Sequence, residues 1–152
     1  MEKTEQRGFE DLECYQLALT MLTQAYGLAE RLPAVERYSL AVQMRRSAAS
    51  VTLNIAEGYG RYHYLDSLRF FYIARGSLME TLSAFVSCEA VGYISTDELD
   101  ILRQLAHGAL RSLNGYIRYV RKQQRGQMEY GNQAIREVQP IYITIPDLST
   151  DD

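Results

Sequence analysis

Four long segments of this chain repeat their apolar residues every three or four positions, and this periodicity constrains the fold more than any other feature. Residues at that spacing lie on one face of an α-helix, so each segment predicts an amphipathic helix. The predicted helices cover residues 10–32, 36–58, 65–91 and 95–124. Because only a few residues connect them, successive helices must run in opposite directions. We therefore predict an all-α, antiparallel up-down four-helix bundle.

Proline, glycine and serine mark the ends of these helices. Pro33 ends the first helix, because it disfavours helical backbone at the preceding residue and donates no backbone hydrogen bond. Gly58 is predicted as the left-handed residue that closes the second helix, and Gly92 marks the end of the third. Ser95 is predicted as the N-cap of the fourth helix, with Glu98 placed to complete a capping box.

Apolar residues cover more of the first two helices than a monomeric bundle needs. The first helix has one stripe of Leu12, Tyr15, Leu19, Leu22, Tyr26 and Ala29, and a roughly opposite stripe of Leu17, Met21, Leu28 and Leu32. The core faces of the others are Leu40, Met44, Ala48, Val51 and Ile55; Leu68, Phe71, Leu78, Leu82 and Phe85; and Leu99, Leu102, Ala106, Ala109, Leu113, Tyr116 or Ile117, and Val120. Between Tyr38 and Ala56 only Arg45 and Arg46 are charged, whereas a surface helix normally has a charged face. These surfaces predict a homo-oligomer.

The composition predicts a cytoplasmic protein without cofactor or metal. Apolar residues make up 47% of the 152 positions and no run approaches the roughly 20 residues that cross a bilayer. The polar N-terminus lacks the apolar core of a signal peptide. Cys14 and Cys88 are interpreted as buried, reduced thiols. Because no Gly-rich phosphate loop, nucleophilic triad or metal-binding cluster is present in the sequence, we expect neither catalytic residues nor an enzyme.

The stretch NIAEGYGRYHY, residues 54–64, carries polar groups but lacks the nucleophile or base that catalysis needs. A buried amide at Asn54 must be hydrogen-bonded and so favours one packing arrangement. Glu57 lies at the unfavourable end of a helix and needs a compensating partner, either Arg61 or an arginine of another helix. The predicted structural polar lock comprises Asn54, Glu57, Gly58, Gly60 and a further candidate pair, Arg45 and Glu80.

The net charge of −3 hides a basic middle of the chain. Residues 37–125 carry twelve basic and seven acidic side chains, against three and seven in residues 1–36 and one and five in residues 126–152. In the fourth helix the cations and His107 fall within about 100° of the helical wheel, over roughly 33 Å. Guanidinium groups in such a row suit phosphates, although a solvated face with local ion pairs has the same pattern. The predicted nucleic-acid-binding residues are Arg103, Arg111, Arg118, Arg121, Lys122 and Arg125, together with Arg61.

Two further segments leave alternatives open. Tyr59, Tyr62 and Tyr64 beside an arginine form a candidate platform for unpaired bases, but tyrosines are also common in packed loops and interfaces. Residues 126–152 lose the helical periodicity and are predicted as an extended or mobile tail after a bundle of residues 1–125. The tail alternates like a strand at PIYITIP. It can pack on the protein's own oligomer, which we favour, add to another protein's sheet, or lay its acidic end over the basic stripe.

The segments LP..ERYSLAVQMRRSAASVTLNIAEGYGR and RFFYIARGSLMETLSAF resemble the bacterial four-helix-bundle family named for proteins encoded in intervening sequences of large-subunit ribosomal RNA genes. The resemblance covers residues 9 to about 122 and extends, more distantly, to the accessory variability proteins of diversity-generating retroelements. It implies a bundle that assembles into a ring, commonly a pentamer. For the accessory branch it implies binding to a reverse transcriptase and to nucleic acid.

Two functions are predicted from these observations. The first is a non-enzymatic, oligomeric accessory protein that binds RNA or DNA, a nucleic-acid enzyme such as a reverse transcriptase, or both. The alternative is a protein-interaction scaffold without nucleic-acid contact, whose basic stripe is solvated or faces an acidic partner. Salt dependence distinguishes them, because phosphate contacts release counterions.

Overall fold

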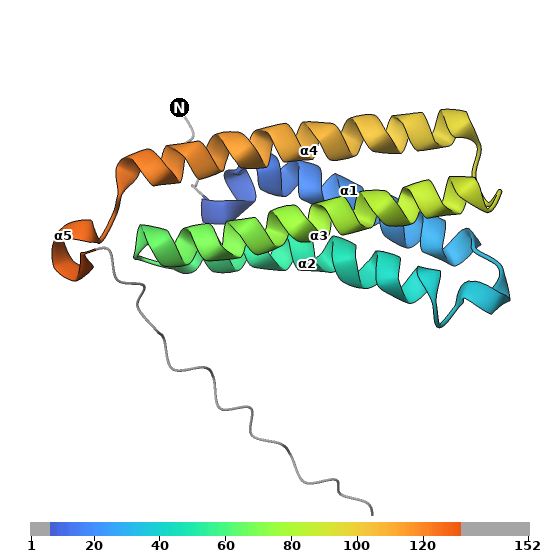
Figure 1. Cartoon of the computed structure of the whole chain (residues 1–152), viewed down its shortest axis with the longest axis horizontal. Coiled ribbons are helices and arrows are strands. Elements are labelled where there is room, and N and C mark those ends of the chain that lie inside the picture. The colour runs from blue at the N-terminus through green and yellow to red at the C-terminus, as the bar shows by residue number, and fades with distance from the viewer. Residues whose placement is uncertain (1–6, 132–152) are drawn as a thin grey trace, which may run out of the picture.

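The computed structural model of the chain describes residues 7–131, and residues 1–6 and 132–152 lie outside the described part. Within it, four long helices run up and down in chain order (Figure 1), which confirms the predicted bundle. The elements are η1 (Gly8–Asp11), α1 (Glu13–Arg31), η2 (Ala34–Glu36), α2 (Leu40–Gly60), α3 (Tyr64–Ala90), α4 (Thr96–Gln123) and α5 (Gln127–Tyr130). The predicted strand at residues 140–146 lies outside the described residues.

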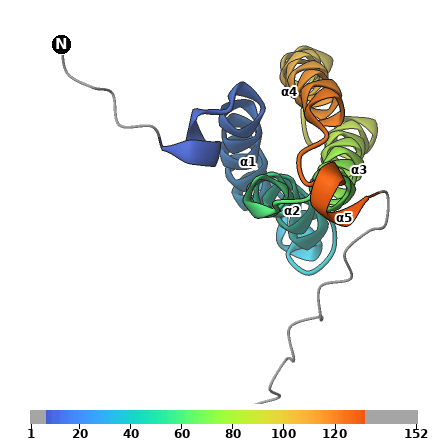
Figure 2. The ribbon, with the colours of Figure 1, turned by 90° about the vertical axis from the view of Figure 1, so that its left-hand side faces the viewer.

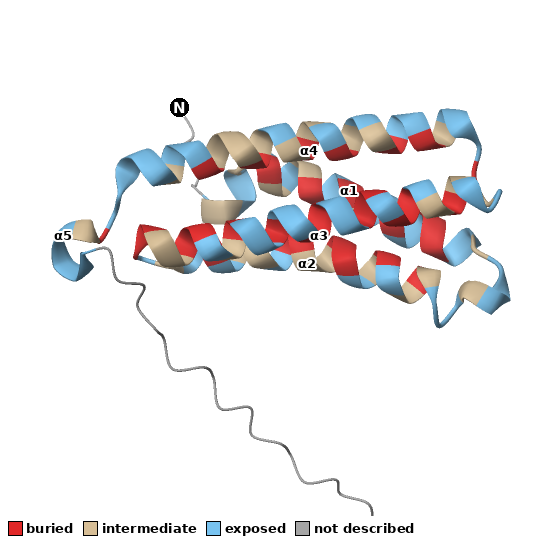
Figure 3. Ribbon diagram, in the orientation of Figure 1, coloured by how far each residue is buried: buried red, intermediate tan, exposed pale blue. Residues whose placement is uncertain are grey.

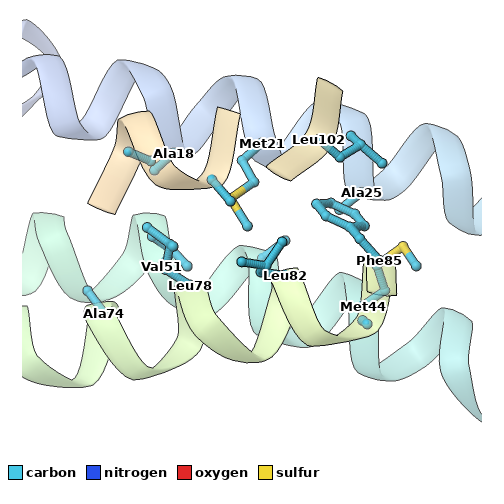
Figure 4. Packing of buried hydrophobic residues seen from close by; sticks show 14 of the residues in the cluster. Ala18, Met21, Ala25, Met44, Val51, Ala74, Leu78, Leu82, Phe85 and Leu102 are labelled. Carbon is cyan, nitrogen blue, oxygen red and sulfur yellow. The ribbon is translucent and has the colours of Figure 1, made fainter. Parts of the chain in front are cut away.

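Each long helix packs against its two neighbours, so that α1 contacts α2 and α4, and α3 contacts α2 and α4. Viewed from the end, the four helices surround one core (Figure 2). Buried residues follow the inward side of every helix (Figure 3), and the close-up shows Met21, Val51, Leu78 and Phe85 meeting between helices (Figure 4). The predicted core faces of α3 and α4 are confirmed, with Phe71, Leu78 and Phe85 fully buried on α3.

The buried face of α1 contains Met21 and Leu28 of the second predicted stripe and only Ala29 of the first. The residues of α1 that enter the core are Cys14, Ala18, Met21, Ala25, Leu28 and Ala29. Leu19 and Tyr26, from the more strongly apolar stripe, remain 38% and 43% exposed. The other buried residues of α1 are Cys14, Ala18 and Ala25, which contribute little to an apolar pattern because they are small, so neither predicted stripe included them.

The lack of a charged face on α2 can be explained by contacts within a single chain. Its face toward the core is buried as predicted, and Ala41, Ser47 and Thr52 are buried as well. This helix contacts both α1 and α3 along its length, so two of its sides are covered. The absence of a charged face on α2 therefore does not by itself require a second copy of the protein.

Helix α2 also begins and ends differently from the prediction. It starts at Leu40 rather than residue 36, because residues 34–36 form a 3-10 turn whose Glu36 carboxylate accepts from the Leu40 N–H at 3.3 Å. It continues through Gly58 to Gly60, so the prediction of a left-handed Gly58 is wrong. A Cβ on Gly58 would lie 2.6 Å from the Phe71 ring, so close packing against α3 explains this glycine.

The boundary between α3 and α4 follows the prediction. Gly92 adopts a left-handed φ of +84°, and its N–H donates to the Glu89 carbonyl at 2.9 Å. The Ser95 Oγ accepts from the Glu98 N–H at 3.1 Å, which makes Ser95 the N-cap of α4. The Glu98 carboxylate forms an ion pair with Arg31.

Candidate nucleic-acid interface

Helix α1 is much shorter than α4, and this difference opens one end of the bundle. It has 19 residues against 28 in α4. The Ser112 hydroxyl donates to the Glu13 carboxylate at 2.8 Å, which places the first residue of α1 beside the middle of α4. About three further turns of α4 extend past that point (Figure 1). We call this end, where the α2–α3 connection and the C-terminus of α4 meet, the cleft end.

A cleft of about 510 Å³ occupies the space between the C-terminal ends of α2 and α4, above the start of α3. We call it the end cleft. Its lining residues are Gly58, Tyr59, Arg61, Tyr62, Tyr64, Ser67, Phe71, Tyr116, Tyr119, Val120, Gln123 and Arg125. It thus unites two separate sequence predictions, because the tyrosine-rich loop and the last turns of the basic helix line the same space.

The wall on the α4 side is a layered group of aromatic rings. The Tyr116 ring packs edge-on against buried Phe71, with ring centroids 5.3 Å apart. Tyr119 stacks on Tyr116 at 5.9 Å with 21° between the ring planes. Burial raises the pKa of Tyr116 to about 12, whereas Tyr119 is 55% exposed. A partly buried, uncharged phenol therefore supports an exposed ring above it.

Arg61 and Arg125 line the end cleft next to the α2–α3 connection. The Arg61 guanidinium lies over the Phe70 ring at 4.7 Å and forms an ion pair with Glu57. Arg61 is therefore the partner of Glu57, and it is one of the two kinds of partner that the sequence predicted for this carboxylate. The Arg125 guanidinium lies over the Tyr62 ring at 4.7 Å. These stacked positions fix both cations beside aromatic surfaces.

Arg125 does not continue the row of cations on α4. The helix ends at Gln123, and Gln124 has a left-handed φ of 46°, which turns the chain toward the α2–α3 connection. There the Arg125 carbonyl accepts from the Tyr64 N–H at 2.9 Å. The helical wheel therefore misplaced Arg125 on the stripe, although the turn brings it to the same cleft.

The remaining cations of α4 divide into two groups. Arg103 pairs with Asp100 at 2.6 Å, so the first member of the predicted stripe lies in a local ion pair. The unpaired group, which we call the α4 cations, consists of Arg111, Arg118, Arg121 and Lys122, all exposed and without an ion pair to any described carboxylate. No aspartate or glutamate occurs in the sequence from residue 101 to 128. The α4 cations span roughly 16 Å.

Of the residues in the predicted polar lock, only Asn54 belongs to a hydrogen-bonded seam between α2 and α3. The Asn54 Nδ2 donates to the carbonyl and hydroxyl of Ser50 at 2.8 and 3.0 Å. Ser50 bonds across to Ser77 of α3 at 2.8 Å, and Thr81 donates to Ser47 at 2.9 Å. The sequence analysis missed Ser77 and Thr81, although two hydroxyls one turn apart in an apolar helix were the available signal. This seam joins α2 to α3.

Arg45 and Glu80 are not brought together. The Arg45 guanidinium lies 5.8 Å from the ring centroid of Tyr26 on α1, and no ion pair links it to Glu80 within residues 7–131. Gly60, the last residue of α2, has no side-chain neighbour within 4 Å of a built Cβ. Arg45, Glu80 and Gly60 therefore do not belong to the seam between α2 and α3.

His63 has a larger structural role than a loop histidine suggests. It is 1% exposed and caps α3, because its Nδ1 accepts from the Leu65 N–H at 3.2 Å. The proton therefore lies on Nε2, which donates to the Gly131 carbonyl at 3.1 Å. This bond, together with the Tyr62 hydroxyl donating to Glu129 at 2.9 Å, fastens α5 to the cleft end. Among residues 7–131, no group of three or more metal-ligating side chains occurs.

No helix in the described residues is both long and apolar enough to pass through a bilayer. Both thiols are buried, and burial raises the pKa of Cys14 and of Cys88 to about 11. The sequence prediction of buried, reduced cysteines is therefore confirmed. Neither thiol is available as a nucleophile at neutral pH.

Comparison with known proteins identifies relatives of the bundle. The model of the 23S rRNA-intervening sequence protein family matches residues 10–115. A crystal structure of a protein of unknown function from the S23 ribosomal protein family of Bacteroides thetaiotaomicron is similar, with a TM-score of 0.64 and 18% identity, covering 68% of this chain and 97% of that chain. At that identity the likeness concerns the fold alone. No curated protein matches the chain. The family match stops before Tyr116, so much of the end cleft lies beyond it.

Proposed function

Since this chain belongs to the 23S rRNA-intervening sequence protein family, we propose that it is a non-enzymatic accessory protein that binds RNA through its cleft end. The family name supports RNA as the class of nucleic acid. We propose a nucleic-acid enzyme such as a reverse transcriptase as the protein partner. Support for that partner is the resemblance of residues 9 to about 122 to retroelement accessory proteins.

The observation that carries the proposal is the group of α4 cations, of which Arg121 lines a hollow between α4 and the start of α3. The four α4 cations and Arg125 are exposed and lie in a 28-residue stretch, 101–128, that contains no acidic residue. A solvated structural face normally mixes both signs of charge, as the Arg103–Asp100 pair does earlier on the same helix. Arginine offers paired donors that suit phosphate oxygens. An uncompensated row therefore favours a polyanion as ligand.

Salt dependence of RNA binding tests this function. Fluorescence anisotropy with a labelled single-stranded RNA should give an affinity that falls about 50-fold between roughly 50 and 200 mM salt, as expected for about four phosphate contacts. Arg118→Glu combined with Arg121→Glu should weaken binding more than about 100-fold, because two phosphate contacts become repulsive. The matched control, Arg37→Glu with Arg46→Glu, changes the same charge at exposed positions away from the cleft end.

Three outcomes separate the readings. Loss of binding in the α4 variant with retention in the control supports the proposal. Equal loss in both variants points to net charge rather than to the cleft end. Absence of salt-sensitive binding by the unmodified protein to RNA and to DNA of the same length rejects nucleic-acid binding and favours the scaffold.

A specific surface favours that second function, a protein-interaction scaffold that self-associates. The outward side of α3 carries alternating large and small residues at 4-3 spacing, all exposed: Tyr72, Gly76, Met79, Ser83, Val86 and Ala90. This is the spacing of a coiled-coil seam, and no charged residue interrupts it. We propose that it packs against a second copy in a closed ring such as a pentamer. Light scattering should then give a multiple of 17.4 kDa, and Met79→Lys with Val86→Lys should give the monomer.

A further inference from the structure

We propose that the end cleft receives an unpaired nucleobase, so that the protein prefers single-stranded or bulged RNA to a continuous duplex. This specificity rests on the proposed RNA binding and adds the form of RNA that the site takes. A row of cations alone accepts single strands and duplexes alike, because both present phosphates. Discrimination requires a place that only an unstacked base can enter.

Tyr119 offers one face for such a base. One side of its ring is stacked on Tyr116, yet the residue is 55% exposed, so the uncovered side faces solvent. A base placed there continues the existing stack of two rings. Tyr116 is itself held by Phe71, which is fully buried, so the platform is anchored in the core.

Tyr59 lines the same cleft from α2 and is 43% exposed. The Phe9 ring packs edge-on against it at 6.3 Å, and Gly8 of η1 lies against the same ring. Tyr59, Tyr116 and Tyr119 line one cleft, so these tyrosines share one neighbourhood. Both rings are therefore supported on one side by other aromatic rings and remain partly open to solvent.

Two cations, Arg61 and Arg125, line the end cleft together with the tyrosines. Arg125 is held at the rim by its stacking on Tyr62, and Arg61 lies on the opposite lining. The α4 cations lie on another face of that helix, where Arg121 lines a separate hollow with Arg69 and Tyr72 of α3. Aromatic faces next to arginines form the arrangement by which proteins hold single-stranded nucleic acid, with bases on rings and phosphates on cations.

A base-paired strand lacks access to these rings. In an A-form duplex the bases are stacked and paired inside, and the outer surface presents phosphates and 2′-hydroxyls. The α4 cations remain reachable for such a duplex, but Tyr59 and Tyr119 gain no contact from it. The predicted difference between single strand and duplex therefore comes from the tyrosines alone.

The experiment compares three RNA probes of the same sequence, each about ten nucleotides long. The first is single-stranded, the second is annealed to its complement, and the third is a single strand with abasic positions. Anisotropy measures affinity. Tyrosine fluorescence reports stacking directly, because the chain has 12 tyrosines and no tryptophan. The single strand should bind about tenfold more tightly than the other two and quench the fluorescence more strongly.

Variants assign that preference to the end cleft. Tyr59→Leu with Tyr119→Leu should weaken single-strand binding about tenfold and leave duplex binding and the salt dependence unchanged. Tyr119→Phe should retain the preference, since stacking needs the ring and not the hydroxyl. The control Tyr38→Leu removes a tyrosine that is 86% exposed in the α1–α2 connection, and it should behave as the unmodified protein.

The result that overturns the base cleft is equal, salt-sensitive binding of all three probes that the tyrosine variants do not alter. That result leaves RNA binding through the α4 cations intact. Failure of every probe to bind overturns both proposals together. Loss of duplex binding in the Tyr59→Leu, Tyr119→Leu variant but not in Tyr119→Phe would assign the tyrosines to folding of the site and also overturn the base cleft.

Discussion

The two ends of the bundle use the same kinds of residue in different balance. At the far end, where α1 meets α2 and α3 meets α4, the Tyr93 hydroxyl donates to Glu36 at 2.9 Å and Arg31 pairs with Glu98. At the cleft end, the Tyr62 hydroxyl donates to Glu129 at the same distance. Both ends are thus tied by a tyrosine–glutamate bond, which raises the tyrosine pKa in each case.

The two ends differ in whether their cations have acidic partners. At the far end Arg31 is paired with Glu98, whereas the α4 cations have no described carboxylate partner. A comparable set of hydrogen bonds closes the far end without such an excess. Architecture therefore does not account for the positive charge at the cleft end, and this comparison supports a ligand there.

The largest expected effect concerns the glycines that serve the two ends. Gly58→Ala should destabilise the protein by about 2–3 kcal/mol, because the new Cβ would lie 2.6 Å from the fully buried Phe71 ring. Gly92→Ala at the far end meets nothing within 4 Å but has a φ of +84°, so it should cost about 1 kcal/mol. Urea denaturation measures both changes.

Gly60→Ala is the matched control, two residues beyond Gly58 in the same helix. A Cβ there meets nothing within 4 Å, and the substitution should stabilise by up to about 0.5 kcal/mol. If Gly58→Ala is as mild as this control, the close packing of α2 on α3 at the end cleft is wrong.

These glycines show what the sequence could and could not predict. Gly92 and the Ser95 cap were predicted correctly, because a helix end depends on residues close in sequence. Gly58 was misinterpreted because its constraint comes from Phe71 on another helix. Arg125 was misplaced on the wheel because the left-handed Gln124 ends the helix before it.

The candidate site illustrates the same limit. The sequence analysis identified the tyrosine-rich loop and the basic helix separately. Their meeting depends on the shortness of α1, whose first residue is bonded to Ser112 rather than to the end of α4. The two apolar stripes predicted on α1 contained the buried Met21 and Leu28 but not Ala18 and Ala25, which packing also buries. Periodicity predicted the helices, and tertiary contacts determined the cleft.

A second prediction compares tyrosines in alkali. The pKa of Tyr116 is raised from 10.0 to about 12 by burial, so the folded protein keeps a proton that the unfolded chain loses. Its contribution is complete below pH 10.0 and is lost as the pH rises to about 12, so stability must fall across that window. The loss is about 1–2 kcal/mol, since Tyr116 is only partly buried.

Urea midpoints measured from neutral pH to pH 11 check this slope. Tyr116→Phe should make the decline shallower, because phenylalanine has no proton to lose. Tyr93→Phe at the far end should change the slope less, since its hydroxyl is near solvent and its raised pKa comes from the bond to Glu36. An unchanged slope in Tyr116→Phe would contradict the burial of this phenol.

A third prediction separates stability from binding at the two ends. Arg31→Ala removes the ion pair with Glu98, whose side chains are 57% and 34% exposed, so it should cost less than about 1 kcal/mol and leave RNA affinity unchanged. Arg118→Ala removes no ion pair and should change stability by less than about 0.5 kcal/mol. Its RNA affinity should nevertheless fall several-fold at low salt. If Arg31→Ala instead weakened RNA binding and Arg118→Ala instead lowered stability, the proposed difference between the two ends would be wrong.

The smallest expected effect concerns residues 132–152, which lie outside the described part of the chain. The described part stops at Gly131, whose carbonyl is bonded to His63 at the cleft end. The segment beyond it carries Arg136 against Glu137, Asp147, Asp151 and Asp152, so its deletion removes three net negative charges. Negative charge tethered near the α4 cations competes with phosphates, and its removal should tighten RNA binding about threefold at low salt.

Salt and sequence provide the controls for this deletion. The gain should vanish at about 1 M salt, where the Debye length is only about 3 Å. Replacing the four acidic residues with their amides in the full-length chain should reproduce the gain, because the charge and not the segment is responsible. If deletion instead weakens the oligomer while the amide variant behaves normally, the isoleucines of the segment pack against the protein. In that case the acidic residues of segment 132–152 would not contribute to the difference between the two ends.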